Sequence, residues 1–248
     1  MEHRPHLPST SLELRRRISR CAGALAVGYR VATLGAAGCL GLLGATAACA
    51  ESEGTWELAD RRGAGDDSIV LFVEEVPTPG RPTFRLETRL AVPPVEAHRV
   101  LVEGMLDPNE APSGQQRKVL ERSSDGAVVY TFIDLPLMLS DRELVLRVRH
   151  SHDASNDVHR VDWNEANELL PAAEKDVVRL EGAAGYWEFR PDGRGGTQAV
   201  HMTRTELGGS FPAALGDRLM KSQAVEAVEK LRARIDRAVA GDVAAGPP

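Results

Sequence analysis

The chain has 248 residues, of which 42% are hydrophobic, 27% charged and 4% aromatic, a composition typical of a globular protein of one or two domains. The first 50 residues hold six of the 30 basic groups and two of the 36 acidic groups, so residues 51–248 carry a net charge of −10. This acidity argues against binding to nucleic acid or to anionic lipid headgroups, because both require clustered Lys and Arg. All three cysteines also lie in the first 50 residues. The remainder therefore has no disulfide framework, thiol nucleophile or thiolate metal site.

Residues 1–50 have the pattern of an export leader. The basic stretch Arg15–Arg20 precedes an apolar run and then the uncharged, Gly- and Ala-rich residues 31–50, as in secretory signal peptides. Three alternatives remain open: ordinary signal-peptidase cleavage, cleavage before Cys49 with lipidation of that cysteine, and an uncleaved membrane anchor. The small residues that end the run favour cleavage, and Thr46–Cys49 resembles a bacterial lipobox. Each alternative predicts an exported domain in the bacterial periplasm or cell envelope, lipid-anchored if Cys49 is modified.

The predicted elements after residue 50 begin with a short helical segment at Trp56–Ala59. An apolar run over Ser68–Val76 and a strictly alternating run over Phe84–Val92 predict two strands, the second with one buried face and one hydrated face. Pro93-Pro94 then starts a helix, which is predicted to end at Asp107 because its three- and four-residue apolar spacing stops there.

Seven further strands and a long helix complete the predicted domain. The strands are expected at Arg117–Arg122, Ala127–Asp134, Arg142–His150, Val158–Trp163, Asp176–Glu181, Tyr186–Arg190 and Thr197–Glu206. After them, apolar residues from Leu215 to Val239 recur mostly every three, four or seven positions, which predicts an amphipathic helix. Residues 242–248 are expected to form a flexible tail. Residues 51–241 are thus predicted to be one α+β domain in which antiparallel strands pack against a long final helix.

Four separated motifs resemble START (StAR-related lipid transfer) domains. They are Leu139–Val145; Trp163, Pro171 and Val178-Arg179; Gly185–Pro191; and Leu207–Pro212. Their order and spacing match that family over about residues 54–240. The resemblance implies a helix-grip fold, as in START and Bet v 1-like proteins. In that fold a curved antiparallel sheet wraps around a long C-terminal helix, and an apolar tunnel between them holds one lipid-sized molecule.

The resemblance implies a protein that binds a hydrophobic, lipid-like ligand, and together with the export leader it predicts transfer of that ligand in the periplasm. We expect no enzymatic activity, cofactor or metal. The candidate ligand-binding residues lie on predicted strands and on the final helix: Tyr130, Phe132, Arg142, Leu144, Leu146, Trp163, Trp187, Met202, Leu215 and Leu219. Ordinary core packing is the alternative for the apolar ones, because a period of two does not reveal which face is concave. We expect a monomer, with membrane contact only through the leader or a lipidated Cys49.

Arg142 is the charged residue among these candidates. A buried guanidinium requires a hydrogen-bonded anion or a polar ligand group, and some START domains place an acidic partner on a neighbouring strand. The matching stretch Val128–Ile133 contains no acid here. If Arg142 points inward, its partner is therefore Asp141, Glu143 or the ligand; the alternative is a carboxylate pairing at the rim of the sheet.

Two other functions remain as alternatives. A polyketide cyclase or aromatase-like enzyme would need acid/base groups that face inward, for which Arg142, Tyr130 and His201 are the candidates. A non-binding envelope lipoprotein scaffold would instead have a cavity filled by its own side chains.

A histidine-rich hairpin is also predicted between two of the strands. Its polar residues are His150, His152, Asp153, Asp157 and His159. A metal site there is compatible with the two-residue spacing, but no zinc-site motif is present. We therefore interpret the hairpin as a solvated tip.

Overall fold

A computed structural model of the chain describes residues 55–75, 81–112, 114–135, 139–171, 176–209 and 213–245. The predicted leader with Cys49 lies outside these residues, as do Ser210–Pro212 before the final helix. Thr55–Pro248 form one compact unit.

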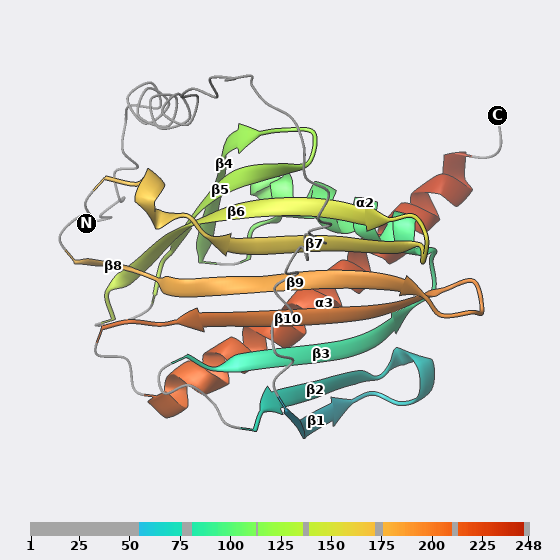
Figure 1. Cartoon of the computed structure of the whole chain (residues 1–248), viewed down its shortest axis with the longest axis horizontal. Coiled ribbons are helices and arrows are strands. Elements are labelled where there is room, and N and C mark those ends of the chain that lie inside the picture. Colours follow the sequence, from blue (N-terminus) through green and yellow to red (C-terminus); the bar gives the residue numbers. More distant parts are fainter. Residues whose placement is uncertain are drawn as a thin grey trace, which may run out of the picture. The chain divides into compact units, whose positions relative to one another are not determined.

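Ten strands form a single sheet in the described part of the chain (Figure 1). They are β1 (Trp56–Arg62), β2 (Ile69–Glu74), β3 (Thr83–Leu90), β4 (Gln115–Arg122), β5 (Gly126–Ile133), β6 (Asp141–Asp153), β7 (Val158–Glu165), β8 (Val177–Arg179), β9 (Glu181–Pro191) and β10 (Thr197–Glu206). Their order is β1-β2-β3-β10-β9-β7-β6-β5-β4, and β8 pairs separately with β6. All neighbours on the main path are antiparallel, whereas β8 runs parallel to β6.

Two α-helices cover one face of the sheet, which we call the inner face; the opposite face is the outer face. Helix α2 (Pro94–Leu106) contacts β7, β9 and β10, while α3 (Ala213–Ala245) contacts β3, β10 and α2. Figure 1 shows α3 crossing the sheet diagonally. Three short 3-10 helices, η2 (Gly65–Asp67), η3 (Pro108–Glu110) and η4 (Asn167–Leu169), lie in the connections. No helix among the described residues is both long and apolar enough to cross a membrane.

The main core lies between the inner face and the two helices. Along β3 every second residue from Phe84 to Leu90 is buried, and the apolar stripe of α3 contributes buried side chains such as Val228 and Leu231. A second cluster lies on the outer face and contains Val128, Tyr130, Phe132, Val145 and Ala166. Because η4 and β8 supply apolar residues to this cluster, β5 is buried on both faces and loses the alternation of a one-sided strand.

Three elements differ from the sequence prediction in more than the exact residue at which a strand begins or ends. Trp56–Ala59 is not helical but opens β1, because its backbone pairs with β2 in a hairpin. The strand predicted at Asp176–Glu181 ends at Arg179, and a second strand, β9, starts two residues later. Helix α3 continues to Ala245, so it extends into the segment expected to be a tail.

Candidate functional site

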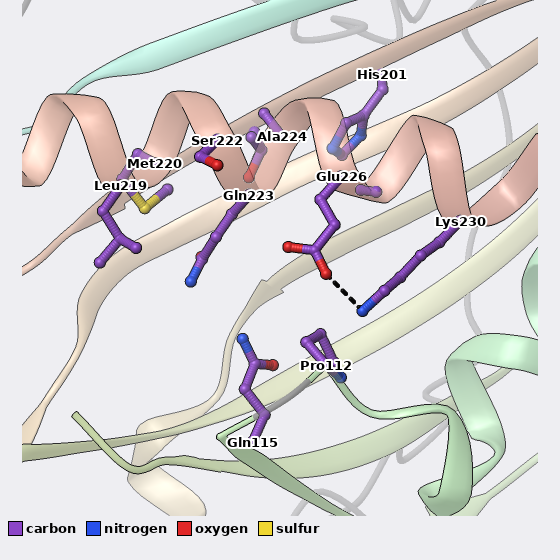
Figure 2. Close-up of a pocket in the computed structure, with 12 residues that line it drawn as sticks. Pro112, Gln115, His201, Leu219, Met220, Ser222, Gln223, Ala224, Glu226 and Lys230 are labelled. Carbon is purple, nitrogen blue, oxygen red and sulfur yellow. Dashed lines mark ion pairs between the residues drawn. The ribbon is translucent and has the colours of Figure 1, made fainter. Parts of the chain in front are cut away.

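A pocket of about 360 Å³ lies between α3 and the inner face. One wall is formed by α3 and the floor by His201 and Thr203 of β10. The opposite wall is formed by Pro112 and by Gln115, the first residue of β4. The described lining residues of α3 are Leu219, Met220, Ser222, Gln223, Ala224, Glu226, Ala227 and Lys230. Figure 2 shows Leu219, Gln223, Glu226 and Lys230 projecting from the helix toward Gln115 and Pro112.

The lining combines apolar and polar side chains. Leu219, Met220, Ala224 and Ala227 supply the apolar part. Glu226 and Lys230 form an ion pair of 2.7 Å one helical turn apart, which is visible at the side of the pocket in Figure 2. A cavity with apolar walls and a few placed polar groups is the usual form of a small-molecule site.

His201 is the buried titratable group of this pocket. Only 5% of its surface is exposed, and its ring stacks on Trp187 with centroids 4.3 Å apart. Burial lowers the pKa of His201 to about 4, so the ring is neutral near pH 7. Its Nδ1 lies 3.4 Å from the carbonyl oxygen of Tyr186. Since a carbonyl only accepts, Nδ1 carries the proton and Nε2 is left as an acceptor.

The lowered pKa of His201 predicts a loss of stability in acid. The unfolded chain binds a proton at His201 more readily than the folded domain does. The contribution of His201 to the free energy of unfolding is therefore fully present above the unfolded-state pKa of about 6.5, and it declines as the pH falls toward 4. At about pH 4.5 we expect this group to lower the free energy of unfolding by about 2 kcal/mol relative to pH 7. His201→Phe keeps a ring for Trp187 but cannot be protonated, so urea denaturation should show a smaller acid loss for this variant. Equal losses in both proteins would contradict the prediction.

Several sequence-predicted residues lie on the inner face but outside the pocket lining. Trp163 and Trp187 are 8% and 3% exposed, and their rings lie beside His201. Leu144 and Leu146 pack with Leu180 and Ala183 in a small inner-face cluster. Among the ten predicted residues, Leu219 is the one found in the described pocket lining.

Four predicted residues are placed elsewhere. Tyr130 and Phe132 belong to the outer-face cluster, because the inner-face positions of β5 are the odd-numbered ones. Met202 likewise alternates with the inward-facing His201 and so lies on the outer face. Leu215 is 47% exposed near the start of α3. We leave these four out of the candidate site.

Arg142 joins β6 to the segment that leads into α3. Its side chain is 3% exposed. Nε donates to the carbonyl of Leu207 at 3.0 Å, Nη2 reaches the carbonyl of Gly208 at 3.5 Å, and Nη1 donates to the carbonyl of Ser140. Burial lowers the pKa of this guanidinium. Its neighbour Glu143 accepts hydrogen bonds from Arg179 and Tyr130 instead. The structure therefore gives Arg142 a main-chain bracing role that the sequence did not predict.

Removing this brace should destabilise the domain. We expect Arg142→Met to lower the free energy of unfolding by about 3 kcal/mol, because the carbonyls of Leu207, Gly208 and Ser140 lose a buried donor. Arg147→Met is the matched control on the same strand, since the exposed ion pair of Arg147 with Glu168 at 3.4 Å is worth less than about 1 kcal/mol. Urea denaturation at pH 7 measures both, and equal losses would contradict the bracing role.

The acid/base groups required by the enzyme alternative do not converge. Tyr130 donates to Glu143 at 3.2 Å from the outer face, and Arg142 contacts main-chain carbonyls near Leu207. Of the three candidates, His201 is the one found in the described lining of the pocket.

The sequence interpretation missed most of the pocket. Gln115 precedes the strand predicted at Arg117–Arg122, and Gln223, Glu226 and Lys230 lie outside the apolar stripe predicted for the final helix, so none of the four was a candidate. The alternation along β10 could have indicated that His201 faces inward, since His201 shares a face with the buried Ala199 and Thr197.

Comparisons with known proteins agree with this architecture. No family model matches the sequence. A StAR-related lipid transfer protein fragment from Xanthomonas axonopodis superposes with a TM-score of 0.61 at 21% identity, over 73% of this chain and 98% of that chain. Human StAR-related lipid transfer protein 5 superposes with a TM-score of 0.59 at 17% identity, over 76% of this chain and 89% of that chain.

A curated relative matches part of the sequence. It is an uncharacterised protein from Pseudomonas aeruginosa, 26% identical over 122 residues. The match covers 49% of this chain and 59% of that protein, so it spans less than two thirds of the relative. The two solved structures, and not this relative, confirm the predicted helix-grip fold.

Proposed function

Because the chain has the helix-grip fold of START domains, we propose that it binds one lipid-like molecule in the pocket between α3 and the inner face, as a binding module without enzymatic activity. The observation that carries this proposal is the cavity of about 360 Å³, which the filled core of a purely structural scaffold would lack. That volume is at the lower end of the range of small-molecule sites. It favours a single-chain or compact-ring lipid over a two-chain phospholipid.

The polar residues of the pocket support an amphipathic ligand. Nε2 of His201 is an acceptor on the floor, while Gln115 and Gln223 add amide groups from opposite walls. Leaving such groups unsatisfied beneath a purely apolar ligand would cost free energy. A ligand with a hydroxyl or carboxyl group on an apolar body satisfies them and still buries apolar surface, at about 25 cal/mol per Å².

We further propose that binding takes place outside the cytoplasmic membrane. The support is the leader pattern of residues 1–50, with its basic, apolar and small-residue segments in the order of a signal peptide. Lipidation of Cys49, or retention of the leader, would hold the binding domain next to a membrane. In that position it would exchange ligand with the bilayer and carry it in the periplasm.

Native mass spectrometry of purified residues 51–248 tests the binding proposal. We expect a bound species whose added mass corresponds to a single lipid-like molecule, displaced by a fluorescent fatty acid or sterol analogue. A protein with no bound species and no binding across fatty acid, sterol and phospholipid analogues would refute it. Transfer is tested separately by the movement of a fluorescent lipid between donor and acceptor vesicles, and turnover of the bound molecule would revive the enzyme alternative.

A further inference from the structure

Four histidines and an aspartate gather where the β6–β7 hairpin lies beside α2, which Figure 1 shows at one end of the sheet. His152 and His159 stack with ring centroids 4.0 Å apart. The ring of His98, in α2, lies 5.2 Å from His159 and 5.7 Å from His150. Asp157 stands in the hairpin turn beside them. None of these five residues belongs to the described lining of the α3 pocket, so this cluster is a separate feature.

The distances within the cluster match those between the ligands of a tetrahedral metal site. Asp157 Oδ1 lies 3.3 Å from Nε2 of His152 and 3.5 Å from Nε2 of His159. Ligand atoms bound tetrahedrally at about 2.0–2.1 Å are about 3.3 Å from one another. One ligand atom from each of His152, Asp157 and His159 lies within 4.8 Å of the other two. The stacked imidazoles need to turn apart for both lone pairs to face one ion.

His98 supplies an independent observation. Its Nε2 is buried and has no hydrogen-bond partner among the described residues, a situation that is uncommon and costly for a polar atom. Burial, together with the neighbouring His150, His159 and His152, lowers the pKa of this ring to about 4. Burial is also the main cause of the lowered pKa of His159. Neutral imidazole is the form that binds a metal ion.

We propose that His152, Asp157 and His159 bind a divalent transition-metal ion of the Zn²⁺ class, and that His98 turns toward it as the fourth ligand. Three imidazoles and one carboxylate favour such an ion over Mg²⁺ or Ca²⁺, which prefer all-oxygen sites. The bound ion links the β6–β7 hairpin to α2. The two elements are otherwise joined there by ring contacts between His98 and the histidines of β6 and β7.

The test is calorimetric titration of the full chain, purified in mild detergent and stripped by a chelator, with Zn²⁺ alone. We expect one ion per chain from the cluster and a higher melting temperature when it is bound. His152→Ala and Asp157→Asn should each weaken binding at least about 10-fold, and His98→Gln to a similar extent. His152 and Asp157 are 44% and 57% exposed, so their substitution leaves the core intact. Asp157 has a φ of +51°, which Asn tolerates well.

The chain also provides a matched control. His3 and His6 lie in the predicted leader, outside the described residues, and their replacement by Ala should leave the Zn²⁺ affinity unchanged. Co²⁺ substitution adds a second measurement, since tetrahedral Co²⁺ with nitrogen and oxygen ligands has strong visible absorption bands that the His152→Ala protein should lack. The proposal is overturned if Zn²⁺ affinity is the same in wild type, His152→Ala and Asp157→Asn, or if it disappears only in the His3/His6 variant.

Discussion

Replacing Ala227 by Trp is expected to abolish most ligand binding while leaving the domain folded. Ala227 lines the pocket from α3 and is partly exposed, at the edge of the main core, so the cavity is the open space into which a larger side chain extends. An indole occupies much of a space of about 360 Å³ and competes directly with the ligand. We expect the affinity for a fluorescent fatty acid or sterol analogue to fall at least about 10-fold, equivalent to about 1.4 kcal/mol.

Ala233→Trp is the matched control for this experiment. Ala233 lies on the exposed side of the same helix, so the same substitution there adds a Trp without entering the cavity. Ala233→Trp should have an unfolding free energy close to that of the wild type, because Ala233 is exposed. Ala227→Trp should stay folded and lose no more than about 1–3 kcal/mol, because Ala227 packs at the edge of the core. If both bind the analogue as tightly as the wild type, the ligand does not occupy the described pocket, and the proposed function loses its structural basis.

Gly185→Ala is expected to destabilise the domain strongly. A Cβ at Gly185 would lie 2.3 Å from the carbonyl oxygen of Met202 and 2.4 Å from Cζ2 of Trp163. The carbonyl belongs to the paired strand β10 and cannot move without breaking the sheet. Overpacking of a core position alone costs about 1–3 kcal/mol. With the backbone clash added, we expect a loss of about 3 kcal/mol or more in urea denaturation.

The same substitution should also disturb the environment of the pocket floor. The Trp163 ring occupies the space left by the missing side chain of Gly185 and lies 5.7 Å from His201. A change in tryptophan fluorescence and near-ultraviolet circular dichroism is therefore expected in any folded fraction. Gly193→Ala is the comparison, since it meets no atom within 4 Å but has a φ of +72°; its cost should be about 1 kcal/mol. Equal losses for the two variants would contradict the steric argument.

The fold was largely predictable because two periodicities dominate the sequence. The alternation of Phe84–Val92 and the apolar stripe of α3 each identify an element and its buried side without tertiary information. The helix predicted at Trp56–Ala59 was wrong because this segment lacks such a periodicity. Trp56–Ala59 is too short to have a decisive period, and its pairing with β2 decides its conformation.

The candidate site was less predictable because a strand pattern separates two faces without saying which one meets the helices. On β5 both faces are buried, since η4 and β8 cover the outer face. The sequence therefore could not distinguish Tyr130 and Phe132, on the outer face, from residues that face the helices. Arg142 was singled out as a candidate, with an inward position and a carboxylate pairing at the rim both left open, and the structure shows that it is buried. Its main-chain partners near Leu207 lie about 65 positions away, however, and no local pattern reveals such a contact.

The histidine cluster also depends on tertiary contacts that the local sequence does not reveal. The hairpin residues His152 and His159 are close in sequence, and their mutual proximity follows from the pairing of β6 with β7. The contribution of His98 depends on how α2 packs across the sheet. Without that residue, a hydrated tip was the reasonable interpretation.

The order of the strands has a further consequence for behaviour at high concentration. Among the described residues β1 and β4 each have a single strand neighbour, and an open edge invites strand addition by another molecule. Both edges are densely charged: β1 carries Glu57, Asp60, Arg61 and Arg62, and β4 carries Arg117, Lys118, Glu121 and Arg122. Pairing of a second molecule's strand with either edge would remove water from these charged groups, which costs free energy. Arg117 is moreover engaged with the carbonyls at the end of α2. The charges on both edge strands therefore disfavour polymerisation through strand addition.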